Sequence, residues 1–377
     1  MKSLKILLSL LFIINSLFSQ ELTVKSKFFG QKRKVLIKLP DNYTNTTFDY
    51  PVIYLLDGQV LFDFLKGLYQ YNSDKYPSAI LVGIIQEDRV NEFVEHKDSL
   101  HNQEIYSHFS DFFVKELIPL INSKYRTNSL NIFIGHSFGG IFLLKKMLMS
   151  NKINNTICIS PTIWVDNYRF LQDIKEYSSQ QHKWIYLGCG EYDFTAIKRG
   201  VEKLSTTINE DMQNCISVTT DIYCSEDHNS SILVGVRKGL NYFFEGFTLP
   251  EDKWVQIEKT GNDTIFNNYF NQLSDSLNCK ILPSEEDYNQ LGYYYLEKER
   301  IDEAKQVFLK NIKLHSYSSN TYDSYGDVLM EVGDYHQALK YYTKAIKIER
   351  KNENDKYQLQ QYQEHIELVK KKINNTY

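Results

Sequence analysis

Short runs that are apolar at nearly every position recur through the first half of this sequence. A strand with apolar side chains on both faces must be covered on both faces, as in a parallel sheet enclosed by helices. Helix-like segments separate the runs, and strands that alternate with helices are typical of an α/β architecture. We therefore expect a doubly wound, mostly parallel sheet. The apolar runs are residues 51–56, 79–85, 132–134, 156–159 and 184–187.

The segments around these runs favour the same architecture. Residues 21–40 alternate well enough for two strands, with Gly30 near the hairpin turn. Residues 106–123 carry large apolar side chains at helical spacing, which predicts the clearest helix of the chain. A further helix is expected over 231–244.

The N-terminus has the features of an export signal. Lys2 and Lys5 supply positive charge, and the apolar stretch 6–18 is too short for a comfortable membrane span. Ser19 ends the stretch with a small residue that suits cleavage. We expect residues 1–19 to be a signal peptide and the mature chain to be secreted or periplasmic, with no membrane span left after cleavage.

Length, charge and cysteine spacing limit the number of domains and the kinds of ligand that the protein is expected to bind. At 377 residues the chain is long for one average domain and suits two. The net charge of −4 is spread over both signs without a basic stripe, so nucleic acid is not an expected partner. The 5 cysteines have a spacing that fits no zinc template, so no metal site is expected.

The C-terminal part of the sequence repeats itself. Gly292 recurs as Gly326 and Ala304 recurs as Ala338, each with an offset of 34 residues. This period, with small residues at matching positions, is typical of tetratricopeptide repeats. Gly and Ala are favoured there because they let helix backbones approach closely. The repeat pattern predicts an all-α C-terminal domain.

These patterns divide the chain into three parts after the signal. We expect an α/β domain over 20–248, a polar linker over 249–284 and tetratricopeptide-like helical repeats over 285–377. Asn311 departs from the repeat pattern, because it stands where a small residue is favoured and where the next repeat has Ala345.

The motif with the clearest chemical meaning is Gly135-His136-Ser137-Phe138-Gly139. It reads G-x-S-x-G, follows one apolar run and precedes another. A strand that turns sharply into a helix on this pattern holds the serine at the apex of the turn, with its hydroxyl exposed. The glycines are needed because a side chain beside the turn would collide with it. Ser137 is therefore the candidate nucleophile.

A serine nucleophile needs a neighbouring base and an acid that orients it. In α/β hydrolases the chain order is Ser, then the acid, then His. His228 lies in a polar loop between a strand and a helix and is the candidate base, whereas His182 precedes a strand and lies at the wrong end of the sheet. The acid should follow the strand at 184–187. Asp193 and Glu191 compete there, and Asp193 is slightly favoured by the glycine turn before it.

Acyl transfer also needs hydrogen-bond donors for the oxyanion that develops. The backbone N–H of Phe138, directly after the nucleophile, is expected to supply one. The loop after Leu56 is expected to supply the other, from the backbone N–H of Gln59.

Taken together, several segments resemble one known family over about residues 22–247. It comprises the esterases of the α/β-hydrolase fold that include esterase D, enterochelin (siderophore) esterases and mycolyltransferases. The resemblance implies a serine hydrolase that acts on esters without a cofactor. It does not fix the substrate, because members act on thioesters, siderophore lactones and sugar-linked acyl groups. The segments are YLLDG at 54–58, FVKELIP at 113–119, GHSFGG at 135–140, SPTIW at 160–164 and the loop around His228.

We therefore expect a serine carboxylic ester hydrolase that acts on a small-molecule ester through an acyl-enzyme at Ser137. An acyltransferase would use the same residues but deliver the acyl group to a sugar or alcohol. A non-catalytic binding protein would work through its helical repeats, but the intact Ser137 and His228 argue against it. A protein partner is an open expectation at the repeats, which are fewer than the three that usually stand alone.

Overall fold

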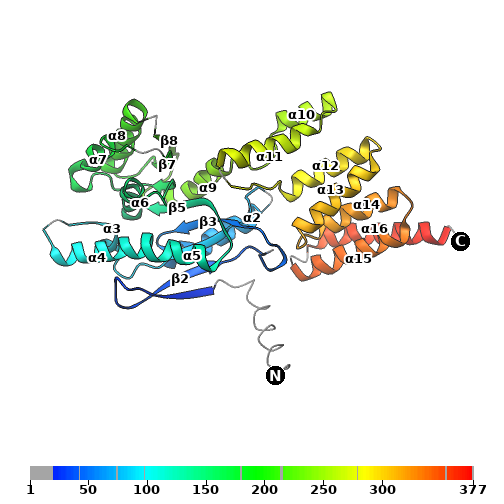
Figure 1. Cartoon of the computed structure of the whole chain (residues 1–377), viewed down its shortest axis with the longest axis horizontal. Helices are drawn as coiled ribbons and strands as arrows, with labels where there is room; N and C mark the ends of the chain where they lie inside the picture. The colour runs from blue at the N-terminus through cyan, green and yellow to red at the C-terminus, as the bar shows by residue number, and fades with distance from the viewer. Residues whose placement is uncertain are drawn as a thin grey trace, which may run out of the picture. The chain divides into compact units, whose positions relative to one another are not determined.

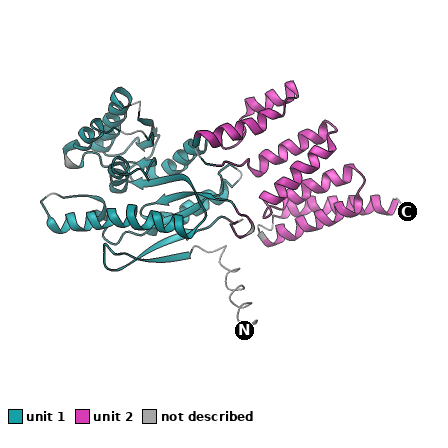
Figure 2. Ribbon diagram, in the orientation of Figure 1, with its two compact units in different colours: residues 1–40, 48–245, 277–279 teal, residues 41–47, 246–276, 280–377 magenta. Residues whose placement is uncertain are grey.

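The computed structural model describes residues 20–41, 43–73, 75–96, 98–178, 181–212, 215–277, 279–352 and 355–375, without the side chains of 166 and 352. The signal peptide expected over 1–19 lies outside the described residues. The chain forms two compact units (Figure 2). The first contains residues up to 40, 48–245 and 277–279, and the second contains 41–47, 246–276 and residues from 280 onward. No helix in the described ranges is both long and apolar enough to cross a membrane.

The first unit is built on an eight-stranded sheet with the order β1-β2-β4-β3-β5-β6-β7-β8. β1, β2 and β4 are antiparallel neighbours, and the other strand pairs are parallel. This confirms the predicted mostly parallel α/β sheet. The strands are β1 (Gln20–Lys25), β2 (Lys32–Lys38), β3 (Tyr50–Leu55), β4 (Ile80–Ile84), β5 (Thr127–His136), β6 (Asn155–Ile159), β7 (Lys183–Gly190) and β8 (Ile216–Tyr223).

Burial explains the sequence pattern of the strands. Every residue of β3 and β4 is buried, because these strands lie inside the sheet and carry helices on both faces. The edge strand β8 instead mixes buried and exposed positions. The hairpin between β1 and β2 contains Gly30 with a φ of 66°, which glycine adopts without a steric penalty.

Helices follow the strands in the expected alternation. α6 packs on β5 and β6, whereas α9 packs on β6 and β7 and also contacts α2. The helices are α2 (Gly58–Tyr71), α3 (Arg89–Phe93), α4 (Leu100–Asp111), η3 (Phe112–Leu117), α5 (Ile118–Lys124), α6 (Phe138–Met149), α7 (Phe170–Lys175), α8 (Thr195–Asp211) and α9 (Ser231–Phe244), with short turns η2 (Tyr43–Asn45) and η4 (Val165–Tyr168).

The helix predicted over 106–123 begins earlier and is not uniform. α4, η3 and α5 together run from Leu100 to Lys124, and η3 is a π-helical turn. Pro119, the second residue of α5, has no N–H to donate to the preceding turn, so the regular α-helical ladder cannot pass through this point.

The second unit is helical in its described part. It contains α10 (Glu251–Thr260), α11 (Thr264–Leu277), α12 (Glu285–Glu297), α13 (Ile301–Leu314), α14 (Asn320–Glu331), α15 (Tyr335–Asn352) and α16 (Lys356–Asn375) (Figure 1). The stretch 249–284, treated above as a linker, therefore holds two helices. Its few apolar residues explain why: Trp254 and Ile257 of α10 and Phe266 and Phe270 of α11 are buried.

The repeat contacts have the predicted basis in small residues. A Cβ atom added to Gly292 would lie 2.5 Å from the Phe308 ring, and one added to Gly326 would lie 2.4 Å from the Tyr342 ring. The aromatic side chain of each second helix therefore lies directly against the backbone of the first. Asn311 is fully buried, and its Nδ2 donates to the Glu285 carbonyl, so an amide occupies the position where the repeat pattern favours a small residue.

Candidate active site

The nucleophile motif forms the turn between β5 and α6. Ser137 has a φ of 57° and a ψ of −116°, a backbone conformation that side-chain-bearing residues rarely adopt. A Cβ atom at Gly135 would lie 2.6 Å from the backbone of Gly139, so only glycine permits this turn. Ser137 itself is largely covered, with 8% of its surface exposed. The sharp strand-to-helix bend has the geometry that the motif predicts, but the serine is less exposed than the motif predicts.

The structure brings His228 and Asp193 together with Ser137. The Nε2 atom of His228 lies 3.1 Å from Ser137 Oγ, and its Nδ1 lies 2.9 Å from Asp193 Oδ1. A carboxylate accepts hydrogen bonds, so Nδ1 carries the proton and Nε2 is free to accept one from the Ser137 hydroxyl. His182, by contrast, bonds to Ser217 near the start of β8, away from this group.

The Asp193 carboxylate is held by three donors. Oδ1 accepts from His228 and from the Phe194 N–H at 2.8 Å, and Oδ2 accepts from the Ser160 hydroxyl at 2.5 Å. Burial by itself raises the pKa of the Asp193 carboxyl, but the hydrogen bonds from His228, Ser160 and Phe194 outweigh it and lower the pKa below its ordinary value. Asp193 is therefore ionised at neutral pH, as an acid that stabilises a histidine cation must be.

Glu191, the second acid candidate, lies elsewhere. Its Oε2 accepts from the Ser225 N–H at 2.8 Å, and this hydrogen bond lowers the pKa of the Glu191 carboxyl. The contact joins the loop after β7 to the loop after β8. Of the two candidates, Asp193 is the one that contacts the imidazole.

Both predicted oxyanion donors lie at helix starts. Gln59 is the second residue of α2 and Phe138 is the first residue of α6. Within the described part of the chain, neither backbone N–H donates a hydrogen bond to a protein acceptor. Unpaired N–H groups at helix N-termini attract negative charge, so both groups suit an oxyanion.

Arg89, which the sequence analysis did not single out, connects these two turns. Arg89 donates to both carboxylate oxygens of Asp57, at 2.7 and 3.0 Å, and to the His136 carbonyl at 3.2 Å. Asp57 precedes α2 and has a φ of 55°. Its backbone N–H donates to the Gln86 side chain at 2.6 Å, and the Gln59 side chain accepts from the Gln86 N–H at 3.3 Å.

The histidine inside the nucleophile motif also contacts the site. His136 Nε2 lies 2.8 Å from the His228 carbonyl oxygen, and the two imidazole rings are 4.8 Å apart. Burial lowers the pKa of His136 to about 4, so the ring is neutral at physiological pH. A neutral ring with its proton on Nε2 donates to this carbonyl and fixes the loop that carries His228.

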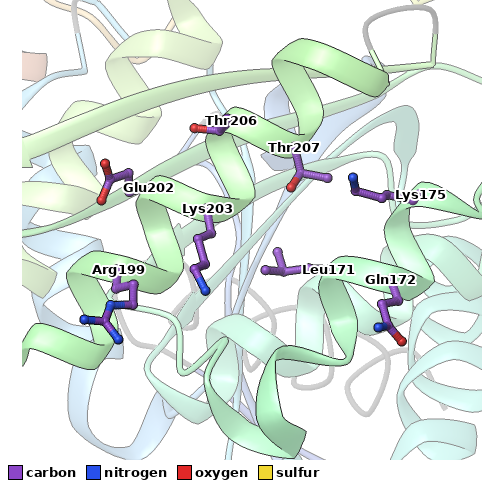
Figure 3. A pocket seen from close by; sticks show the side chains of 8 residues that line it. All are labelled: Leu171, Gln172, Lys175, Arg199, Glu202, Lys203, Thr206 and Thr207. Carbon is purple, nitrogen blue, oxygen red and sulfur yellow. The ribbon is translucent and has the colours of Figure 1, made fainter.

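Two other features are separate from this group of residues. A cavity of about 880 Å³ lies between α7 and α8 and is lined by Leu171, Gln172, Lys175, Arg199, Glu202, Lys203, Thr206 and Thr207 (Figure 3). In the second unit, Asp323, Asp327 and His365 bring three ligand-type atoms within 4.8 Å of one another. These three side chains already bond within the protein: His365 to Asp323, and Asp327 to the hydroxyl groups of Tyr293 and Tyr342.

The mostly parallel sheet, with the strand-to-helix turn at Ser137, has the fold of the α/β-hydrolase class. Residues 26–218, more than half of the chain, match the family described as Putative esterase, and the chain belongs to that family of hydrolase enzymes. Residues 288–314 and 319–352 match the tetratricopeptide repeat. Both matches agree with the resemblance found in the sequence.

Individual proteins that resemble this chain have low sequence identity to it. The uncharacterized protein YbbA of Bacillus subtilis is 27% identical over 153 residues, which are 36% of this chain and 59% of that protein, so the match spans less than two thirds of this relative. An IroE-like serine hydrolase from Shewanella oneidensis has a similar structure, with a TM-score of 0.64 and 23% identity over 79% of this chain and 99% of the other. An uncharacterised protein from Capnocytophaga ochracea has a TM-score of 0.62 and 16% identity, over 94% of this chain and 99% of the other.

Proposed function

We propose that this protein is a serine carboxylic ester hydrolase that works through Ser137, His228 and Asp193. The observation that carries the proposal is the continuous hydrogen-bonded line from Ser137 Oγ through the His228 ring to Asp193, with contacts of 3.1 and 2.9 Å. Membership of the Putative esterase family supports the same reaction class.

The first half of the reaction forms an acyl-enzyme. Ser137 Oγ attacks the ester carbonyl carbon while its proton passes to His228 Nε2. The carbonyl oxygen becomes an oxyanion and accepts from the Gln59 and Phe138 N–H groups. When the tetrahedral intermediate collapses, the bond to the alkoxy group breaks and His228 returns the proton to the departing alcohol.

The second half releases the acid. Water attacks the acyl carbon while His228 Nε2 takes one of its protons. The bond to Ser137 Oγ then breaks, and the serine recovers the proton from His228. Asp193 stays ionised throughout and stabilises the imidazolium that forms in each half.

The surroundings of His228 support a small-molecule ester as the substrate. The Phe194 ring lies 5.2 Å from the His228 ring and is 66% exposed, so an apolar surface adjoins the reacting atoms. Lys2, Lys5 and the apolar stretch 6–18 support export, which makes extracellular or periplasmic esters the relevant pool.

A substrate series tests the proposal. Purified protein is assayed with nitrophenyl esters of increasing acyl length, a siderophore trilactone, and feruloyl and acetyl sugars, beside Ser137→Ala. The proposal predicts hydrolysis of at least one ester that Ser137→Ala loses, and it fails if the folded wild type cleaves none or if the variant cleaves equally well. Adding an acceptor alcohol separates the acyltransferase alternative, because a transferase yields the new ester in place of the free acid.

A further inference from the structure

A buried serine that the reaction does not use contacts the acid of the site. Ser160 directly follows β6 and begins the SPTIW segment, and none of its surface is exposed. Its Oγ lies 2.5 Å from Asp193 Oδ2. An ionised carboxylate offers no hydrogen, so the Ser160 hydroxyl is the donor in this contact.

A second buried hydroxyl lies behind the first. Ser231, the first residue of α9, is also fully buried, and its Oγ lies 2.9 Å from Ser160 Oγ and 2.9 Å from the His228 carbonyl oxygen. Ser160 has only one hydroxyl hydrogen, and Asp193 takes it. Ser160 therefore cannot donate to Ser231, and the single hydroxyl hydrogen of Ser231 goes either to Ser160 or to the His228 carbonyl.

The His228 carbonyl does not depend on Ser231, because His136 Nε2 reaches the same oxygen at 2.8 Å. Ser231 can thus donate to Ser160 while His136 serves the carbonyl. When the Ser231 hydrogen is on Ser160, a chain of donors runs from Ser231 through Ser160 to Asp193 Oδ2, on the side of the carboxylate opposite His228. Hydrogen bonds arranged in such a buried chain polarise and strengthen one another.

We propose that Ser160 and Ser231 are positioning residues that fix the Asp193 carboxylate in its orientation toward His228. The inference rests on the proposed function, since it assigns a role toward the same Ser137 reaction. With Oδ2 held by Ser160, Oδ1 faces the His228 Nδ1–H. The same hydrogen bond withdraws charge from the carboxylate, which tempers its stabilisation of the imidazolium.

Removing the Ser160 hydroxyl should shift the pH profile of kcat/KM in a predictable direction. The carboxylate loses one donor, keeps more of its charge and stabilises the imidazolium more strongly. The acid limb of the kcat/KM profile should therefore move to higher pH. The other titratable groups around Asp193 are His136 on β5, Cys189 on β7 and Asp227 in the loop before α9. None of them is altered by the substitution.

The test compares pH profiles of kcat/KM on an ester that the wild type hydrolyses. Ser160→Ala is expected to lose about 10-fold or more in kcat/KM and to move the acid limb upward by about half a pH unit. Ser231→Ala should move it in the same direction by less. Ser160→Gly should behave like Ser160→Ala without adding backbone strain, because Ser160 has a φ of 47°, which glycine adopts freely.

Ser205→Ala is the matched control. It also removes a hydroxyl from a hydroxyl pair, here with Thr220 at 2.8 Å on α8 and β8, and should leave the profile unchanged. An acid limb that stays in place in both Ser160 variants overturns the inference, even if activity falls, because a merely structural role predicts that result. A loss in Ser160→Ala that Ser160→Gly does not share also overturns it. A folded wild type without esterase activity would instead count against the proposed function.

Discussion

Replacing Arg89 by methionine should damage the oxyanion site beyond its effect on stability. The guanidinium donates to both oxygens of Asp57, at 2.7 and 3.0 Å, and to the His136 carbonyl at 3.2 Å. Asp57 begins the turn that carries the Gln59 N–H, and His136 directly precedes Ser137. One side chain therefore joins the turn with one oxyanion donor to the turn with the nucleophile.

The burial of the pair sets the expected loss of stability. The Asp57 side chain is 8% exposed and that of Arg89 is 34% exposed, so the pair lies between a surface and a buried ion pair. Exposed pairs contribute up to about 1 kcal/mol, and breaking a buried pair costs about 3–5 kcal/mol. We therefore expect Arg89→Met to lower the free energy of unfolding by about 2 kcal/mol.

The expected loss of activity has a different origin. If the Gln59 N–H moves out of reach of the oxyanion, one donor is lost, which lowers kcat by about 100-fold or more. KM should change little, because this donor acts mainly on the charge of the transition state. Stability is measured by urea unfolding. Both kcat and KM are measured on a nitrophenyl ester over a range of concentrations up to saturation.

Two further variants make this prediction refutable. Arg169→Met removes an exposed arginine 3.9 Å from Asp173 and should change neither quantity measurably. The double variant Asp57→Asn with Arg89→Met leaves no unpaired buried charge, so it should regain stability without regaining kcat. The reasoning is refuted if Arg89→Met loses stability and keeps the kcat of the wild type.

Three other substitutions probe the site and the repeats. Asp193→Asn should lower kcat by about 10³-fold or more, because the amide no longer favours the correct imidazole tautomer, whereas Glu191→Gln, assayed in parallel, should stay within about threefold. Burial lowers the pKa of His136 to about 4. The neutral His136 ring therefore contributes fully to the free energy of unfolding above about pH 6.5, and this contribution is lost as the pH falls through 4. In urea unfolding from pH 7 to 4, His136→Gln should lose less unfolding free energy than the wild type. Gly326→Ala puts a Cβ 2.4 Å from the Tyr342 ring and should lower the free energy of unfolding by about 1–3 kcal/mol. The control Gly67→Ala has nothing within 4 Å of its new Cβ and should be neutral or stabilising. Equal effects of the two variants in thermal unfolding would contradict the packing argument.

The sheet could be predicted because its signal is local and strong. Strands buried on both faces need apolar residues at every position, and β3 and β4 have them. The sharp turn at Ser137 could be predicted because it tolerates only small flanking residues, and the contact of His228 with Ser137 because chain order leaves few alternatives. The repeats were predictable because Gly292 and Gly326 mark the close approach of helices at a fixed period.

The choice between Asp193 and Glu191 needed the path of the backbone. The Glu191 N–H still pairs with the Tyr223 carbonyl at 2.8 Å, so Glu191 continues the edge of β7 toward the loop after β8. The Asp193 N–H instead turns back to the Gly190 carbonyl at 3.2 Å, and this turn directs the carboxylate to the imidazole. Two carboxylates this close in sequence carry no local signal that separates them.

The supporting residues escaped prediction for a similar reason. Arg89 is far from Asp57 in the chain, and Ser160 is far from Asp193. Both contacts depend on the strand order, because it brings the loops after β3, β4, β6 and β7 together at the carboxyl ends of the strands. The helices α10 and α11 were missed because each buries only two residues, too few to produce a clear helical period.

The central claim is that His228 activates Ser137, and covalent labelling tests it most directly. The wild type and the variants Ser137→Ala and His228→Ala are treated with a fluorophosphonate, and the modified peptide is identified by mass spectrometry. We expect the label on Ser137, none on Ser137→Ala, and a labelling rate at least about 100-fold lower in His228→Ala. A folded wild type that takes no label at Ser137, or a His228→Ala variant that labels at the rate of the wild type, would contradict the claim.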